Sequence, residues 1–184
     1  MAKLIYVPVM HSSIEMGSAA AAYQAAFVAR FGEAKWAERT REFDVIWHAI
    51  ETAIAALGLD LTKLKLYQDS LPVCDREIGL TRELAAQGSR NHQLLASLVE
   101  SGATLIGTES PALLLEEYRL LQSSDRTAEQ TATLLERRDR FIAERIDSTL
   151  RGDETGLLFI GVLHQVARFL PARISVEYLA VQIP

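Results

Sequence analysis

Ionisable residues follow four of the five strands that the sequence predicts, and two of these residues are histidines. His11 follows the first strand, with Glu15 one helical turn later, and His164 follows the fourth strand. Asp69 and Glu109 follow the second and third strands. Imidazoles and carboxylates that share one crevice can bind a divalent metal ion or divide the acid and base steps of a hydrolysis. We therefore expect a His/Glu site where the strands end.

Short apolar runs separated by helical patterns provide the elements that position these residues. The apolar runs predict strands at 4–9, 64–67, 103–107, 157–162 and 173–179. Apolar residues at three- and four-residue spacing, or a helical composition, predict helices at 18–31, 38–57, 78–101, 111–121 and 127–150, the last capped by Asp125, and a helical turn at 166–170. The alternation predicts an α/β fold of three layers, in which a mostly parallel sheet of about five strands has helices on both faces.

The carboxyl ends of parallel strands are where ligands bind in such sheets, because the loops converge there on a rigid support. A cap or turn role is the competing interpretation for each polar residue at a strand end. Two histidines, His11 and His164, both follow predicted strands, and this coincidence favours a functional interpretation over caps and turns.

Composition limits the classes of protein to consider. The 184 residues are 49% hydrophobic and 23% charged, without a Pro/Gly/Ser-rich linker, which predicts one globular domain over residues 1–184. The net charge of −5, with no basic tail, argues against a nucleic acid partner. We find no signal peptide, no apolar stretch of transmembrane length and one cysteine, so we expect a cytoplasmic protein that does not enter the membrane.

Other reactive side chains have simpler explanations. His48 and His92 fall inside predicted helices without a second His or Cys one turn away, so we interpret both as structural. Cys74 is expected to be a buried or half-buried thiol. Ser12, Ser13 and Ser110 lack a G-x-S-x-G context, so capping and turn roles suffice for them.

Two segments together resemble a known superfamily. Arg138-Asp139 followed by Ile142-Ala143 resembles the Arg-Asn-x-x-Met-Ala helix of the TraB and Tiki superfamily, and the segment 161–164, Gly-Val-Leu-His, resembles its second G-x-x-H motif. This superfamily also includes the erythromycin esterases and the ChaN haem-binding lipoproteins. The chain departs from it in having Pro8 in place of the Gly of the first G-x-x-H motif, and Asp139 in place of Asn. By itself, the 136–146 segment predicts only a helix with Phe141, Ile142 and Ile146 inward and its charges outward.

The resemblance implies a hydrolase of peptide or ester bonds. His11 and His164, with Glu15, are the implied ligands of a divalent metal ion, or they position water. Glu15 or Glu109 is the implied ligand or general base, and Arg138 is implied to hold an anionic group or to stabilise developing negative charge. The implied partner is a small-molecule or peptide substrate.

Two alternatives stand beside the hydrolase. The same crevice could hold a small molecule or a haem-type cofactor through His11 or His164 without turning it over. The domain could also act through protein contacts, as a homodimer joined along the fifth strand or along the helix at 127–150.

Overall fold

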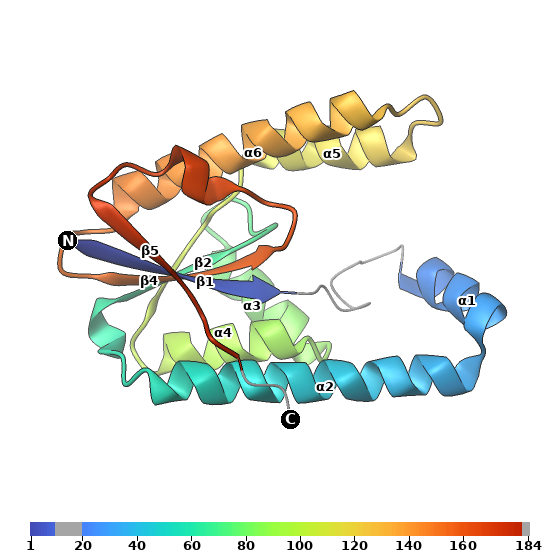
Figure 1. The fold of residues 1–184 in the computed structure, drawn as a ribbon, viewed down its shortest axis with the longest axis horizontal. Helices are drawn as coiled ribbons and strands as arrows, with labels where there is room; N and C mark the ends of the chain where they lie inside the picture. Colours follow the sequence, from blue (N-terminus) through green and yellow to red (C-terminus); the bar gives the residue numbers. More distant parts are fainter. Residues whose placement is uncertain (10–19, 182–184) are drawn as a thin grey trace.

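The central element of the computed structural model is a five-stranded parallel sheet between two layers of helices (Figure 1). The model describes residues 1–9 and 20–181. Within these residues, the strands lie in the order β3-β2-β4-β1-β5. Their bounds are β1 (Ala2–Val9), β2 (Leu64–Gln68), β3 (Thr104–Ile106), β4 (Thr155–Gly161) and β5 (Ile174–Tyr178). The predicted three-layer α/β fold is confirmed.

The helices that connect the strands divide between the two faces of the sheet. One layer contains α2 (Glu33–Ala56), preceded by α1 (Ala20–Phe31), together with α3 (Glu77–Ala86) and α4 (Arg90–Glu100). The other contains α5 (Pro111–Gln122) and α6 (Ala128–Thr149), at the top of Figure 1. Two short 3-10 helices, η2 (Leu61–Lys63) and η3 (Val166–Phe169), precede β2 and β5. Helices α1, α2, α5 and α6 extend beyond the edge at which β1 ends (Figure 1).

Helices bury both faces of the sheet. Successive side chains of each strand point to opposite sides, so every strand contributes to both cores. In β4, Leu157 and Phe159 pack into the core beneath α2 and α4, with Trp47 of α2. Leu158 and Ile160 pack into the other core, against Ile142 and Ile146 of α6 and Val166 of η3. This two-sided burial explains why the strands read as continuous apolar runs.

The single helix predicted at 78–101 is wrong, because the chain forms two helices there. Gly88 adopts a φ of 98° after α3, a left-handed conformation that glycine reaches at little cost. The side chain of Ser89 then accepts a hydrogen bond from the backbone N–H of His92 and caps α4. The Gly-Ser pair is therefore a helix stop followed by a helix start.

The predicted Asp125 cap is also wrong. Thr127 is the N-cap of α6 and forms a capping box with Gln130, in which each side chain accepts a hydrogen bond from the backbone N–H of the other. Two backbone N–H groups at the start of α6 are satisfied in this way. Within the described residues, no helix is both long enough and apolar enough to span a membrane.

Candidate functional site

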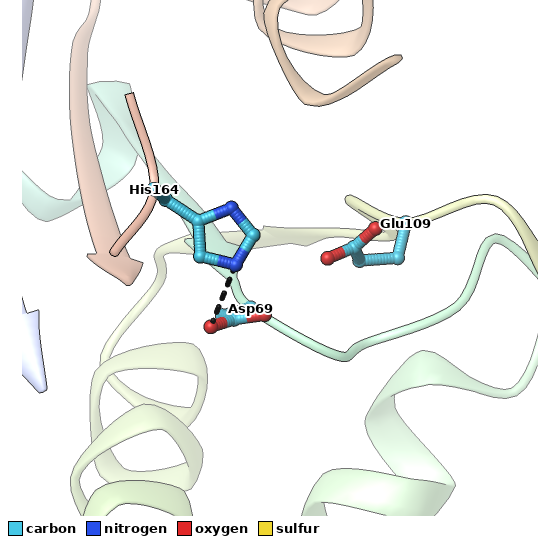
Figure 2. A group of neighbouring side chains, drawn as sticks. All are labelled: Asp69, Glu109 and His164. Atoms are coloured by element: carbon cyan, nitrogen blue, oxygen red, sulfur yellow. Dashed lines mark ion pairs between the residues drawn. The ribbon is translucent and has the colours of Figure 1, made fainter. Parts of the chain in front are cut away.

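Three ionisable side chains converge at the carboxyl ends of three neighbouring strands. Asp69 follows β2, Glu109 follows β3 and His164 follows β4, and these strands are adjacent in the order β3-β2-β4. Each side chain offers one ligand atom, and these atoms all lie within 4.8 Å of one another (Figure 2). The Nε2 atom of His164 lies 3.4 Å from Oδ2 of Asp69. The convergence matches the position at which parallel sheets bind ligands.

Backbone hydrogen bonds fix the loops that carry Asp69 and Glu109. The N–H groups of Thr108 and Glu109 both donate to the carbonyl oxygen of Leu71, at 2.9 Å, and the N–H of Val73 donates to the carbonyl of Glu109. Gly107 makes this close approach possible, because a Cβ atom there would lie 2.9 Å from Cα of Val73. The two carboxylates are thus held on one rigid pair of loops.

The backbone is strained directly after Asp69. Ser70 has a φ of 64°, in the left-handed region, which costs a residue other than glycine roughly 1–2 kcal/mol. Such strain persists where surrounding contacts maintain it, and it is concentrated at functional sites. The Oδ2 atom of Asp69 in turn accepts a hydrogen bond from the N–H of Gly161, at 3.2 Å.

Arg138 of α6 forms hydrogen bonds with the carboxylates of both Asp69 and Glu109. Its Nη2 atom donates to Oε1 of Glu109 at 2.6 Å and to Oδ1 of Asp69 at 2.9 Å, while its Nη1 atom donates to Glu117 at 2.5 Å. The side chains of Arg138, Asp69 and Glu109 are 5%, 4% and 0% exposed. Two of the three carboxylates that pair with Arg138 are therefore buried, whereas Glu117 is 35% exposed. The forked guanidinium suits several carboxylate acceptors.

Asp139, the next residue along α6, orients His164. Its Oδ1 atom lies 2.5 Å from Nδ1 of His164, and its Oδ2 atom accepts a hydrogen bond from the N–H of Gln165 at 2.8 Å. A carboxylate at Nδ1 fixes the ring and leaves Nε2 directed at the other acids, an arrangement common around histidines that bind metals. Arg138 and Asp139 thus face inward, contrary to the expectation that all charges in this segment point outward, whereas Glu136, Arg137 and Arg140 are exposed as expected.

Negative charge exceeds positive charge in this cluster. Asp69, Glu109 and Asp139 are buried with Arg138, so two negative charges remain when His164 is neutral. Burial raises the pKa of Glu109 above its ordinary value, although the hydrogen bond from Arg138 opposes this shift. Burial by itself lowers the pKa of His164, but the hydrogen bond to Asp139 and the charge of Asp69 outweigh it and raise the pKa. The excess charge thus favours either bound protons or a bound cation.

The raised pKa of His164 predicts a pH dependence in the metal-free protein. The folded state holds this proton more tightly than the unfolded state does, so the resulting stabilisation is complete below a pH of about 6.5. It is lost as the pH rises through the higher pKa of the folded state. An NMR titration should place the His164 pKa above 6.5 in the wild type, and lower in Asp139→Asn. A wild-type value below 6.5 would contradict the geometry described above.

Three residues predicted from the sequence, Glu109, Arg138 and His164, come together in this cluster. His11 and Glu15, predicted to share it, lie outside the described residues. Asp69 follows a predicted strand, but sequence reasoning did not select it as a site residue. Asp139 was noted in the sequence only because it stands in place of the Asn of the superfamily's helix motif.

For the reactive side chains that we interpreted from the sequence as structural, the structure agrees with some expectations and contradicts one. His92 is buried and hydrogen-bonded to Ser89, and Ser110 caps α5, as expected. His48 lies exposed on α2. The expectation of a buried or half-buried Cys74 is wrong: this residue is exposed, in the irregular segment between β2 and α3.

Comparison with protein-family models, with curated proteins and with solved structures gives no match to this chain.

Proposed function

We propose that the chain is a metal-dependent hydrolase of ester or peptide bonds, with its centre at Asp69, Glu109 and His164. The observation that carries the proposal is the convergence of their three ligand atoms within 4.8 Å in a buried cluster. Three protein ligands that leave coordination positions open are typical of catalytic metal sites.

The charge of the cluster favours a divalent cation. Among the buried side chains, Asp69, Glu109 and Asp139 with Arg138 leave two negative charges around a neutral His164, and the partly exposed Glu117, which also pairs with Arg138, adds a third. A divalent ion offsets most of this charge. Two carboxylate ligands and one imidazole suit Mn²⁺ or Zn²⁺. Such an ion lowers the pKa of water and polarises a carbonyl group.

Arg138 and Asp139 act as positioning residues in this proposal. Arg138 places the carboxylates of Asp69 and Glu109 side by side through hydrogen bonds from its Nε and Nη2 atoms, and its Nη1 atom donates to Glu117. These hydrogen bonds favour the interpretation that Arg138 positions the two carboxylates. The resemblance instead implies that Arg138 contacts the substrate directly. Asp139 holds Nδ1 of His164, so that Nε2 would be free to bind an ion shared with Asp69 and Glu109.

The resemblance to the TraB and Tiki superfamily supports the same assignment, because the Arg-containing helix and the G-x-x-H segment are parts of one cluster here. His11 and Glu15 remain candidate ligands or bases, since β1 ends at Val9, opposite Gly161 of β4. The burial of the cluster favours a small ester or short peptide over a folded protein as the substrate. A haem-type group is disfavoured, because Nε2 of His164 faces carboxylates.

The proposal is tested with protein that has been stripped of metal and then supplied with Zn²⁺ or Mn²⁺. We expect hydrolysis within a panel of nitrophenyl esters and short chromogenic peptides. Glu109→Gln should reduce kcat/KM roughly 100-fold or more, since a ligand is lost. Its unfolding free energy should change by only about 1 kcal/mol, because Arg138 keeps Asp69 and Glu117 as partners.

Glu116→Gln is the matched control, because Glu116 lies on the surface of α5 and pairs only with exposed Arg137 among the described residues. This variant should retain wild-type activity. Equal hydrolysis by Glu109→Gln and by Glu116→Gln would contradict the proposed centre.

A further inference from the structure

Helix α5 leads away from the candidate site. Ser110, the residue after Glu109, is its N-cap. Two turns later, Glu117 accepts a hydrogen bond from Nη1 of Arg138, and the side chain of Glu117 is partly exposed. Glu117 therefore lies where the buried cluster meets solvent. From there the helix continues past the edge at which β1 ends (Figure 1).

The fold uses only one side of α5, the side that contacts α6. Glu116 and Glu117 pair with arginines of α6, and Leu120 lines a hollow together with Leu134 of α6. Within the described part of the chain, no side chain of α5 is buried and none belongs to either hydrophobic core. The remaining surface of α5 is therefore open to a ligand.

Apolar side chains line this remaining surface beside Glu117. Leu114, Tyr118 and Leu121 lie three or four residues apart, so they share one face of the helix with Glu117. Tyr118 is 57% exposed, Leu121 58% and the adjoining Leu115 48%, while Leu114 is half-buried. These four apolar residues form the α5 stripe, which extends about 10 Å along the helix axis. The α5 stripe thus starts beside the charged cluster and leads outward from it.

We propose that the α5 stripe holds the acyl chain of an ester substrate whose carbonyl group lies at Asp69, Glu109 and His164. This substrate class rests on the proposed hydrolase activity. A polar cluster at one end of an apolar stripe suits an amphiphilic molecule, with its reacting group among the polar side chains and its hydrocarbon chain along the helix. The substrate is therefore an ester of a medium-length fatty acid.

The chemistry of the α5 stripe favours an acyl chain over a peptide or a protein. Extended peptides are held largely through main-chain hydrogen bonds, whereas the main-chain groups in the middle of a helix bond within the helix. A stable protein interface buries about 800 Å² on each partner, from about 20–30 residues. Four apolar side chains supply only a small part of such an area, but they suffice to contact one hydrocarbon chain.

Hydrolysis of nitrophenyl esters with acyl chains of increasing length tests the α5 stripe on the metal-loaded chain. For the wild type, we expect kcat/KM for the octanoate ester to exceed that for the acetate ester roughly 10-fold or more, since each buried methylene adds to binding. In the variant that carries Tyr118→Gln and Leu121→Gln, this advantage should fall roughly 10-fold through a higher KM, with acetate hydrolysis unchanged. Both side chains are exposed, so the variant should keep the thermal stability of the wild type.

The matched control carries Val45→Gln and Leu57→Gln. Both residues are exposed and apolar, and they lie in and just after α2, in the helical layer on the other side of the sheet (Figure 1). This variant should keep the preference for the octanoate ester. A wild type that hydrolyses both esters equally well, or a control that loses the preference as fully as the α5 variant does, would overturn the proposed acyl-chain site.

Binding of octanamide, a stable amide with the same chain, separates the acyl-chain site from the hydrolase. In an NMR titration of the metal-free protein, octanamide should shift the backbone amide signals of residues 114–121, with roughly 10-fold weaker binding to the α5 variant. Such binding without hydrolysis of any ester would support the acyl-chain site and overturn only the hydrolase. Signals that do not shift, or equal binding by the variant, would overturn the site. A dimeric wild type with a monomeric α5 variant would assign the α5 stripe to a second copy and overturn it as well.

Discussion

Arg138→Gln is expected to lose about 3–5 kcal/mol of unfolding free energy at pH 7, which would be the largest effect of any single substitution in the cluster. Glu109 is 0% exposed and Asp69 4%, and Arg138 is the cation that pairs with both. Removing one partner of a buried ion pair leaves a charge that neither water nor protein compensates. Urea denaturation followed by circular dichroism measures the loss.

The pH dependence of this loss identifies its cause. Burial raises the pKa of Glu109, so this carboxylate becomes protonated as the pH falls and no longer needs the cation. The difference between Arg138→Gln and wild type should therefore shrink from pH 7 towards pH 4. Arg140→Gln, on the exposed side of the same helix, should change stability by less than about 0.5 kcal/mol. A loss of equal size at pH 4 and pH 7 would show that lost packing, and not unpaired charge, causes it.

His164→Ala is expected to reduce metal-dependent hydrolysis by roughly 10²–10⁴-fold, the second large effect. His164 supplies the nitrogen among the three converging ligand atoms, and its Nε2 atom lies 3.4 Å from Oδ2 of Asp69. Its loss should cost only about 1 kcal/mol of stability, because Asp139 keeps its hydrogen bond from the N–H of Gln165. Steady-state kinetics on the best substrate of the panel, together with thermal denaturation, measures both quantities.

His92→Ala is the matched control for this variant. His92 is buried to a similar degree and is hydrogen-bonded to Ser89 at the start of α4. Its removal should lower stability by about 1–3 kcal/mol and leave kcat/KM unchanged. The reverse result, with activity lost in His92→Ala and kept in His164→Ala, would move the functional site to the other side of the sheet.

The fold could be predicted largely because strands buried on both faces leave a clear signal. The run at 157–162 contains the core of β4, and its apolar continuity reflects contact with Trp47 on one side and Ile146 on the other. The break at Gly88 was missed because the flanking helical patterns have compatible composition. The helix stops because Gly88 adopts a left-handed φ, and a new helix starts because Ser89 caps it. A glycine followed by a serine is a sequence signal for such a break.

The site could be predicted in part. The strand-end rule identified Glu109 and His164 as site residues, because the carboxyl ends of parallel strands meet at one edge. The same rule placed Asp69 after a strand, but Asp69 was not selected. The inward direction of Arg138 and Asp139 could not be read from helical spacing, which fits a solvated charged face equally well. The burial of Arg138 is favourable only because it pairs with Asp69 and Glu109 at the strand ends. The burial of Asp139 likewise depends on its contact with His164.

Metal stoichiometry tests the central claim most directly. The protein is stripped with a chelator, equilibrated with Zn²⁺ or Mn²⁺, passed through a desalting column and analysed by mass spectrometry, for wild type and for His164→Ala. We predict close to one ion per chain in the wild type and a loss of most of it in His164→Ala. A wild type that retains neither ion, or a variant that retains as much as the wild type, would contradict a metal centre at Asp69, Glu109 and His164.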